Sequence, residues 1–143
     1  MELRITAIYR PELATALALR LFLCRVPAGF PSPADDYLDE LLDLNKKLIT
    51  NQSATFLARA EGNSMQGAGI FSGDLLIVDR SLKPAAGKVV VASLDGELVV
   101  KRYGLVDGKP FLLSENPSYA PIPLSEDHEL VIWGVVVHCI HTI

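Results

Sequence analysis

The sequence has few of the features that mark several classes of protein. Only 7% of its 143 residues are aromatic, and its two cysteines, Cys24 and Cys139, stand far apart. Isolated cysteines of this kind give no disulfide framework and no metal-ligand spacing, which fits the reducing cytoplasm and predicts no metal site. No apolar run approaches the ~20 residues that a membrane-spanning helix needs, so we expect no membrane association.

The chain also lacks a block of basic residues. Its 13 Lys and Arg residues and 17 Asp and Glu residues give a formal net charge of -4. Because proteins bind nucleic acid largely through basic side chains, we expect little direct DNA binding. Half of the residues are hydrophobic, which at this length predicts one globular domain rich in aliphatic side chains, and we predict no cofactor.

The N-terminal region imitates a secretory signal peptide. An apolar run from Leu13 to Leu23 follows Arg4 and Arg10. Arg20 interrupts this run and leaves an apolar core too short for export. We instead predict a short helix opened by Pro11, because apolar residues recur there at spacings of four and three, namely Leu13, Leu17, Leu21 and Cys24.

A proline-rich linker over residues 29–33 leads into a second predicted helix. Ser32 is a suitable N-cap, and Pro33 fits the first helical position. Lys46 and Lys47 suit the C-terminal end of this helix. Its predicted apolar face consists of Tyr37, Leu38, Leu41, Leu42 and Leu48.

From Ala54 onward the sequence predicts short strands separated by turn signals. These strands are residues 55–60, 75–78, 88–94, 97–103, 110–114 and 130–140. Asp95-Gly96 is the strongest hairpin signal, and a two-residue loop there places Lys101 opposite Val90. We therefore predict a mainly β fold, a small domain of short strands and hairpins with a flexible N-terminal arm and one short helix.

Two polar residues in this β region are candidates for catalysis. Ser64 lies in the glycine-bracketed turn 62–67, and Lys101 ends the apolar segment 98–101. A serine hydroxyl needs a base within hydrogen-bond reach, and a lysine can be that base if burial lowers its pKa from ~10.4 to about 7–8. Each residue alone is more often a turn former or a solvated strand-end residue, but apolar neighbours around Lys101 favour a serine–lysine dyad.

Six short segments occur in an order that is typical of one family. Over residues 28–140 the chain resembles the LexA/UmuD family of self-cleaving serine peptidases, and the UmuD branch most closely. Ser64 and Lys101 are 37 positions apart (101 − 64), which is the spacing of that family. The segments are Phe30–Tyr37, Gly62–Met65, Gly73–Asp79, Gly96–Lys101, Asn116–Tyr119 and Trp133–Val136.

The resemblance implies a mechanism and a cleavage site. Ser64 is the implied nucleophile, Lys101 the general base, and the backbone N–H groups of Asn63 and Ser64 the oxyanion donors. The bond between Ala28 and Gly29 is the implied self-cleavage site, since small residues let the backbone enter a narrow cleft.

The resemblance also implies a division of the chain into three parts. We expect an arm over residues 1–28 that self-cleavage removes, a linker with a short helix over 29–53, and a β-rich peptidase and dimerisation domain over 54–143.

The resemblance implies particular partners as well. It predicts a homodimer, self-cleavage stimulated by RecA filaments on single-stranded DNA, and a shortened form that joins a UmuC-like Y-family polymerase subunit in error-prone translesion synthesis. The apolar segment 130–140 independently favours dimerisation, because one small sheet can hardly bury all of its side chains.

Three alternatives remain open. A LexA-like transcriptional repressor needs a DNA-binding helix-turn-helix, and the 28 residues before Gly29 contain no basic two-helix pattern. A signal peptidase shares the serine–lysine chemistry but needs a membrane anchor. In a non-enzymatic β interaction module, Ser64 and Lys101 would be incidental.

Overall fold

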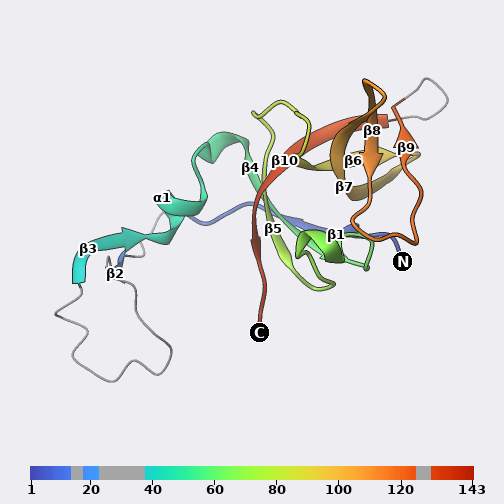
Figure 1. Ribbon diagram of the computed structural model, residues 1–143. Coiled ribbons are helices and arrows are strands. Elements are labelled where there is room, and N and C mark those ends of the chain that lie inside the picture. The colour runs from blue at the N-terminus through green and yellow to red at the C-terminus, as the bar shows by residue number, and fades with distance from the viewer. Residues whose placement is uncertain (14–17, 23–37, 125–129) are drawn as a thin grey trace. The chain divides into compact units, whose positions relative to one another are not determined.

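The computed structural model describes residues 1–13, 18–22, 38–124 and 130–143 (Figure 1). The chain forms two compact units, which we describe separately. The larger contains residues 1–11 together with residues 51–143, and the smaller contains residues 12–50.

The larger unit is an eight-stranded sheet with the order β1-β4-β5-β10-β6-β7-β8-β9. Each neighbouring pair is antiparallel. Arg4 of β1 also pairs with Val99 of β7, so the N-terminal strand contacts both β4 and β7. The strands are β1 Arg4–Tyr9, β4 Thr55–Glu61, β5 Leu75–Asp79, β6 Val89–Leu94, β7 Glu97–Val106, β8 Lys109–Leu113, β9 Ile122–Pro123 and β10 Leu130–Ile140, with 3₁₀ helices at Gln52–Ala54 and Gln66–Ala68. The predicted mainly β fold is confirmed.

The smaller unit pairs β2 (Ala18–Phe22) with β3 (Leu38–Asp43), and α1 (Leu44–Leu48) follows β3 directly. The helix predicted across Leu13–Cys24 is therefore wrong over residues 18–22. Leucines at 17, 19, 21 and 23 also alternate with a period of two, which suits a strand as well as the four-residue spacing suits a helix.

The second predicted helix is shorter than expected. Residues 38–43 are a strand, and α1 begins only where the Asp43 side chain accepts a hydrogen bond from the N–H of Asn45 at 3.0 Å. An aspartate in this position satisfies a free N–H group of the first turn, so the cap lies at Asp43. The predicted N-cap Ser32 lies outside the described residues.

The β6–β7 hairpin has the predicted register. Leu94 faces Glu97, and Val90 faces Lys101. Asp95 and Gly96 have φ angles of 48° and 86°, the left-handed pair that a type I′ turn requires. This turn fixes which β7 side chains share a face, and it thereby sets the position of Lys101.

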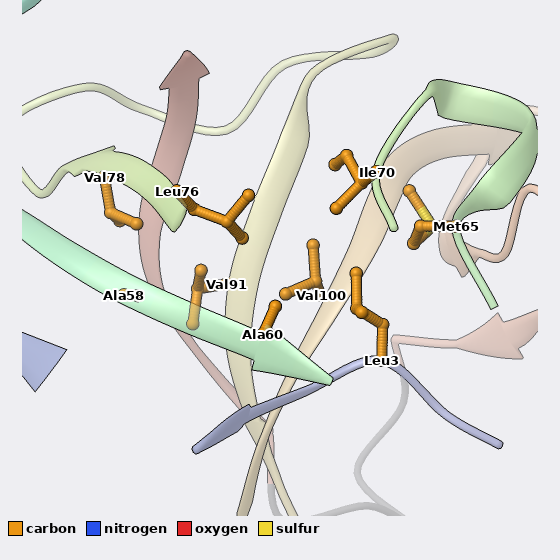
Figure 2. Packing of buried hydrophobic residues seen from close by; sticks show 9 residues of the cluster. All are labelled: Leu3, Ala58, Ala60, Met65, Ile70, Leu76, Val78, Val91 and Val100. Atoms are coloured by element: carbon orange, nitrogen blue, oxygen red, sulfur yellow. The ribbon is translucent and has the colours of Figure 1, made fainter. Parts of the chain in front are cut away.

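The main hydrophobic core lies between β4, β5, β6, β7 and the segment that follows β4 (Figure 2). Leu3, which precedes β1, is fully buried in it, and its side chain points toward Met65 and Val100. A second cluster contains Val90, Ala92, Leu112 and Val135. The nine residues of the main cluster are Leu3, Ala58, Ala60, Met65, Ile70, Leu76, Val78, Val91 and Val100.

A polar cluster joins the end of β10 to the start of β5. Buried Asp74 accepts a hydrogen bond from the Cys139 thiol at 3.1 Å, and its other carboxylate oxygen lies 2.6 Å from Nδ1 of His141. The N–H of Phe71 also donates to Asp74, at 2.8 Å. These contacts give His141 a structural role.

Candidate active site

Ser64 lies in the turn that follows β4 and is completely buried. Its Oγ accepts a hydrogen bond from the backbone N–H of Leu3 at 2.8 Å. Its carbonyl accepts a second from the N–H of Glu115 at 2.9 Å, which ties the turn to the segment after β8. Gly62, two residues earlier, has a φ of 129°, a conformation that a side chain would strain. The glycine that brackets Ser64 in the sequence is therefore required by the backbone.

Lys101 in β7 is only 1% exposed. Its Nζ donates to Oγ of Ser114 at 2.5 Å and lies 2.5 Å from a carboxylate oxygen of Glu2. The ammonium also lies 5.4 Å from the centre of the Tyr119 ring, within the range of a cation–π contact. A buried ammonium needs such polar partners, because burial without them is very costly. The predicted burial of Lys101 is confirmed.

Ser64 and Lys101 contact adjacent residues on two separate segments. On the segment before β1, Ser64 contacts the N–H of Leu3 and Lys101 contacts the side chain of Glu2. On the segment after β8, Ser64 contacts the N–H of Glu115 and Lys101 contacts the hydroxyl of Ser114. Because each pair of contacts falls on consecutive residues, the fold brings the two candidate catalytic residues to one small, buried site.

Asn63 holds the turn against the segment after β8. Its side-chain oxygen accepts a hydrogen bond from the Tyr119 hydroxyl at 3.0 Å, and its carbonyl accepts one from the Asn116 amide at 3.1 Å. Its backbone N–H, one of the predicted oxyanion donors, donates to the carbonyl of Met1 at 2.8 Å. This N–H group is therefore already directed at a peptide carbonyl.

Sequence reasoning missed Glu2, Ser114 and Tyr119 as members of this site. For Ser114 a signal was available. Arg102 pairs with Leu113 across β7 and β8, so continuing that register by one position places Ser114 opposite Lys101. The Asp107-Gly108 turn, with positive φ angles of 52° and 76°, supports this register as Asp95-Gly96 supports that of β6 and β7.

Three further predictions concern the cleavage site, metal binding and membrane-spanning helices. The implied cleavage site, Ala28-Gly29, falls in the stretch 23–37, which lies outside them. Among the described residues no group of three or more His, Cys, Asp or Glu side chains is arranged to hold a metal ion. None of the helices in the described ranges is long and apolar enough to cross a membrane.

Comparison with known proteins identifies the family. The model of the Peptidase S24-like family matches residues 20–137, which is most of the chain. The chain belongs to the Peptidase S24-like family. Protein SamA of Salmonella typhimurium is 50% identical over 123 residues, covering 85% of this chain and 84% of SamA. Protein ImpA of Escherichia coli is 46% identical over 123 residues, covering 85% of this chain and 82% of ImpA.

A repressor of the same family is also similar over a shorter part of its length. LexA repressor 1 of Pseudomonas syringae pv. tomato is 40% identical over 114 residues, covering 79% of this chain and 56% of the repressor. The predicted resemblance to the LexA/UmuD family is confirmed. Membership of this S24 family assigns the chain to the self-cleaving serine peptidases.

Proposed function

We propose that this protein cleaves its own Ala28–Gly29 bond with a Ser64–Lys101 dyad. The observation that carries the proposal is that both side chains are buried and contact consecutive residues of one segment, the N–H of Leu3 and the carboxylate of Glu2. Convergence of a serine and a lysine on one short segment of polypeptide supports a site that binds a peptide for cleavage.

The proposed reaction is an acyl transfer followed by hydrolysis. Neutral Lys101 takes the proton of Ser64 as Oγ attacks the carbonyl carbon of Ala28, and the N–H groups of Asn63 and Ser64 stabilise the oxyanion. Protonated Lys101 then gives that proton to the departing amine of Gly29. Water then attacks the acyl group and releases it from Ser64. The proton that this water loses returns to Oγ of Ser64.

Ser114 has a positioning role in this proposal. Its Oγ accepts a hydrogen bond from Lys101 Nζ, which fixes the lysine amine at the end of a long flexible side chain. Orienting a general base within hydrogen-bond reach of its proton donor is a requirement of general-base catalysis.

Incubation of the purified chain with RecA, ATP and single-stranded DNA tests the cleavage. We expect a fragment whose N-terminal sequence begins at Gly29, formed faster with the filament than without it. Without RecA, the rate should rise with pH above neutrality, because only the neutral amine accepts a proton. Lys101→Ala should remove this reaction, whereas Lys83→Ala, at an exposed position, should keep it. A fragment beginning elsewhere would contradict the proposed bond.

We also propose that the shortened chain is a cytoplasmic accessory subunit of an error-prone translesion polymerase and acts as a homodimer. The identity to SamA and ImpA, 50% and 46%, is higher than the 40% identity to the repressor and supports this assignment. Exposed apolar side chains on β10, Val131 and Ile140, are suitable for packing against a second copy.

Assembly and biological role have separate tests. Sedimentation at micromolar concentration should give a dimer before and after cleavage, and a strictly monomeric species would contradict that part. In damaged cells a chain starting at Gly29 should support mutagenesis, whereas Ser64→Ala should not. Equal mutagenesis from the two would contradict the role, and a DNA-binding assay would detect the repressor alternative.

A further inference from the structure

The first three residues of the chain contact all three groups that the proposed reaction needs. The carbonyl of Met1 accepts from the N–H of Asn63 at 2.8 Å, the proposed oxyanion donor. The carboxylate of Glu2 lies 2.5 Å from Nζ of Lys101, and the N–H of Leu3 donates to Oγ of Ser64 at 2.8 Å.

The N-terminal segment, Met1–Leu3, is also well packed. Leu3 is fully buried in the main core cluster, where Figure 2 shows its side chain directed toward Met65 and Val100. The carbonyl of Leu3 accepts a hydrogen bond from the N–H of Val100 at 3.0 Å. Burial of this leucine side chain removes apolar surface from water, so it favours the bound position of the segment.

The turn before Ser64 is shaped to admit this segment. A Cβ atom added at Gly62 would lie 2.1 Å from the carbonyl oxygen of Glu2, far inside the closest contact that two such atoms allow. Glycine at this position thus serves two purposes, since it adopts the positive φ and leaves room for the passing backbone.

The bound arrangement is unreactive for a clear chemical reason. Oγ of Ser64 uses one of its two lone pairs to accept the N–H of Leu3, so this contact competes with the approach of Oγ to a carbonyl carbon. The Glu2 carboxylate lies 2.5 Å from Nζ of Lys101, so the amine is engaged by the segment and not by the hydroxyl of Ser64. The segment therefore occupies the groups that the proposed reaction would use.

We propose that Met1–Leu3 is a competing ligand of the peptidase site and must leave before the bond to be cleaved can bind. The inference rests on the proposed dyad. The ligand it defines is an extended peptide whose second residue is acidic and whose third is a large aliphatic residue. The site would bind the same sequence as a free peptide.

Charge and packing variants of the full-length chain test this proposal. Glu2→Gln and Leu3→Ala should each raise the rate of RecA-independent self-cleavage by roughly tenfold, since the observed rate scales with the fraction of open sites. Glu61→Gln, which removes an exposed carboxylate at the end of β4, is the matched control and should cleave at the wild-type rate. A synthetic peptide of residues 1–9 should slow the Glu2→Gln chain, whereas the same peptide carrying Gln at its second position should slow it less.

Amide hydrogen exchange in the uncleavable Ser64→Ala background provides a readout that needs no cleavage. The readout is the Val100 amide, which donates to the carbonyl of Leu3 and does not depend on Ser64. Glu2→Gln should speed exchange of the Val100 amide, and Glu61→Gln should not. If no chain cleaves while Val100 exchange responds as expected, the proposed function fails and the binding of the segment stands. If Glu2→Gln opens the site but cleavage stays at the wild-type rate, or if neither peptide slows the Glu2→Gln chain, the competing-ligand proposal is overturned.

Discussion

Two polar clusters in the larger unit contain similar chemical groups in different arrangements. At the candidate active site, Ser64 and Lys101 lie beside the carboxylate of Glu2. At the end of β10, Cys139 and His141 lie beside the carboxylate of Asp74. Each cluster thus has a nucleophilic atom, a basic nitrogen and a carboxylate. The two clusters differ in which of these groups the carboxylate contacts. Asp74 contacts both the thiol and the imidazole, whereas Glu2 contacts the lysine amine.

In the β10 cluster the carboxylate is at the centre and suppresses the nucleophile. Burial, together with the neighbouring Asp74 carboxylate, raises the pKa of the Cys139 thiol to about 12, so the thiolate is scarce near neutrality. Asp74 directly precedes β5 and is buried. At the candidate active site the carboxylate is that of Glu2, in the segment that we propose leaves the site before cleavage. The contrast suggests that reactivity depends on a removable carboxylate.

The largest expected effect separates the two nucleophiles. Ser64→Ala should lower self-cleavage by about three orders of magnitude or more, because the attacking oxygen is lost. Cys139→Ala should leave the rate within about twofold, because its thiol donates to the structural carboxylate of Asp74. Mass spectrometry of the intact chains over time measures both. Comparable losses in the two variants would show that the clusters act together.

The positions of Ser64 and Lys101 show which features of the candidate site could be predicted from the sequence. Asp95-Gly96 demands a left-handed two-residue turn, and that local demand fixes the position of Lys101 at long range. Ser64 could be predicted because it follows Gly62, whose positive φ requires a glycine. These features are encoded locally, so the sequence predicts them well.

The part that was not predicted depends on contacts between distant segments. Nothing near Glu2 in the sequence indicates that it meets Lys101, because that contact follows from β1 pairing with β4 and β7. The wrong helix over 18–22 has a related cause. Its leucines satisfy both periods, and pairing with β3 decides between them.

The next effect concerns thiol reactivity. In a Cys24→Ser background, Asp74→Asn should raise the rate at which Cys139 reacts with a thiol reagent at pH 8 by roughly tenfold. The substitution removes the negative charge that, with burial, holds the thiol protonated. Asp79→Asn is the matched control, since Asp79 is equally buried but bonds Ser81 and Asn51. Equal acceleration in both variants would indicate general loosening of the fold.

A smaller effect concerns the contribution of each cluster to the free energy of unfolding. Asp74→Asn should lower the free energy of unfolding by about 1–3 kcal/mol, because hydrogen bonds to a buried charged group are weakened. Replacing both partners of the Lys101–Glu2 ion pair, in the double variant Glu2→Gln/Lys101→Met, should change it by less than about 1 kcal/mol, because neutral side chains can replace a buried ion pair at little cost. Urea unfolding measures both. A large destabilisation by the double variant would mean that the ion pair with Glu2 is structural.

The smallest effect is the acid dependence of the β10 cluster. Burial opposes ionisation of Asp74, but hydrogen bonds from Phe71, His141 and Cys139 outweigh burial and lower its pKa below 3.8. A carboxylate with a lowered folded-state pKa stabilises the fold above its unfolded-state pKa, and this contribution is lost as pH falls through the folded-state value. Urea unfolding from pH 6 to pH 3 should therefore show a smaller loss of stability for Asp74→Asn than for the wild type. Parallel losses in the two chains would assign the acid sensitivity to other carboxylates, of which Asp79 also has a lowered pKa.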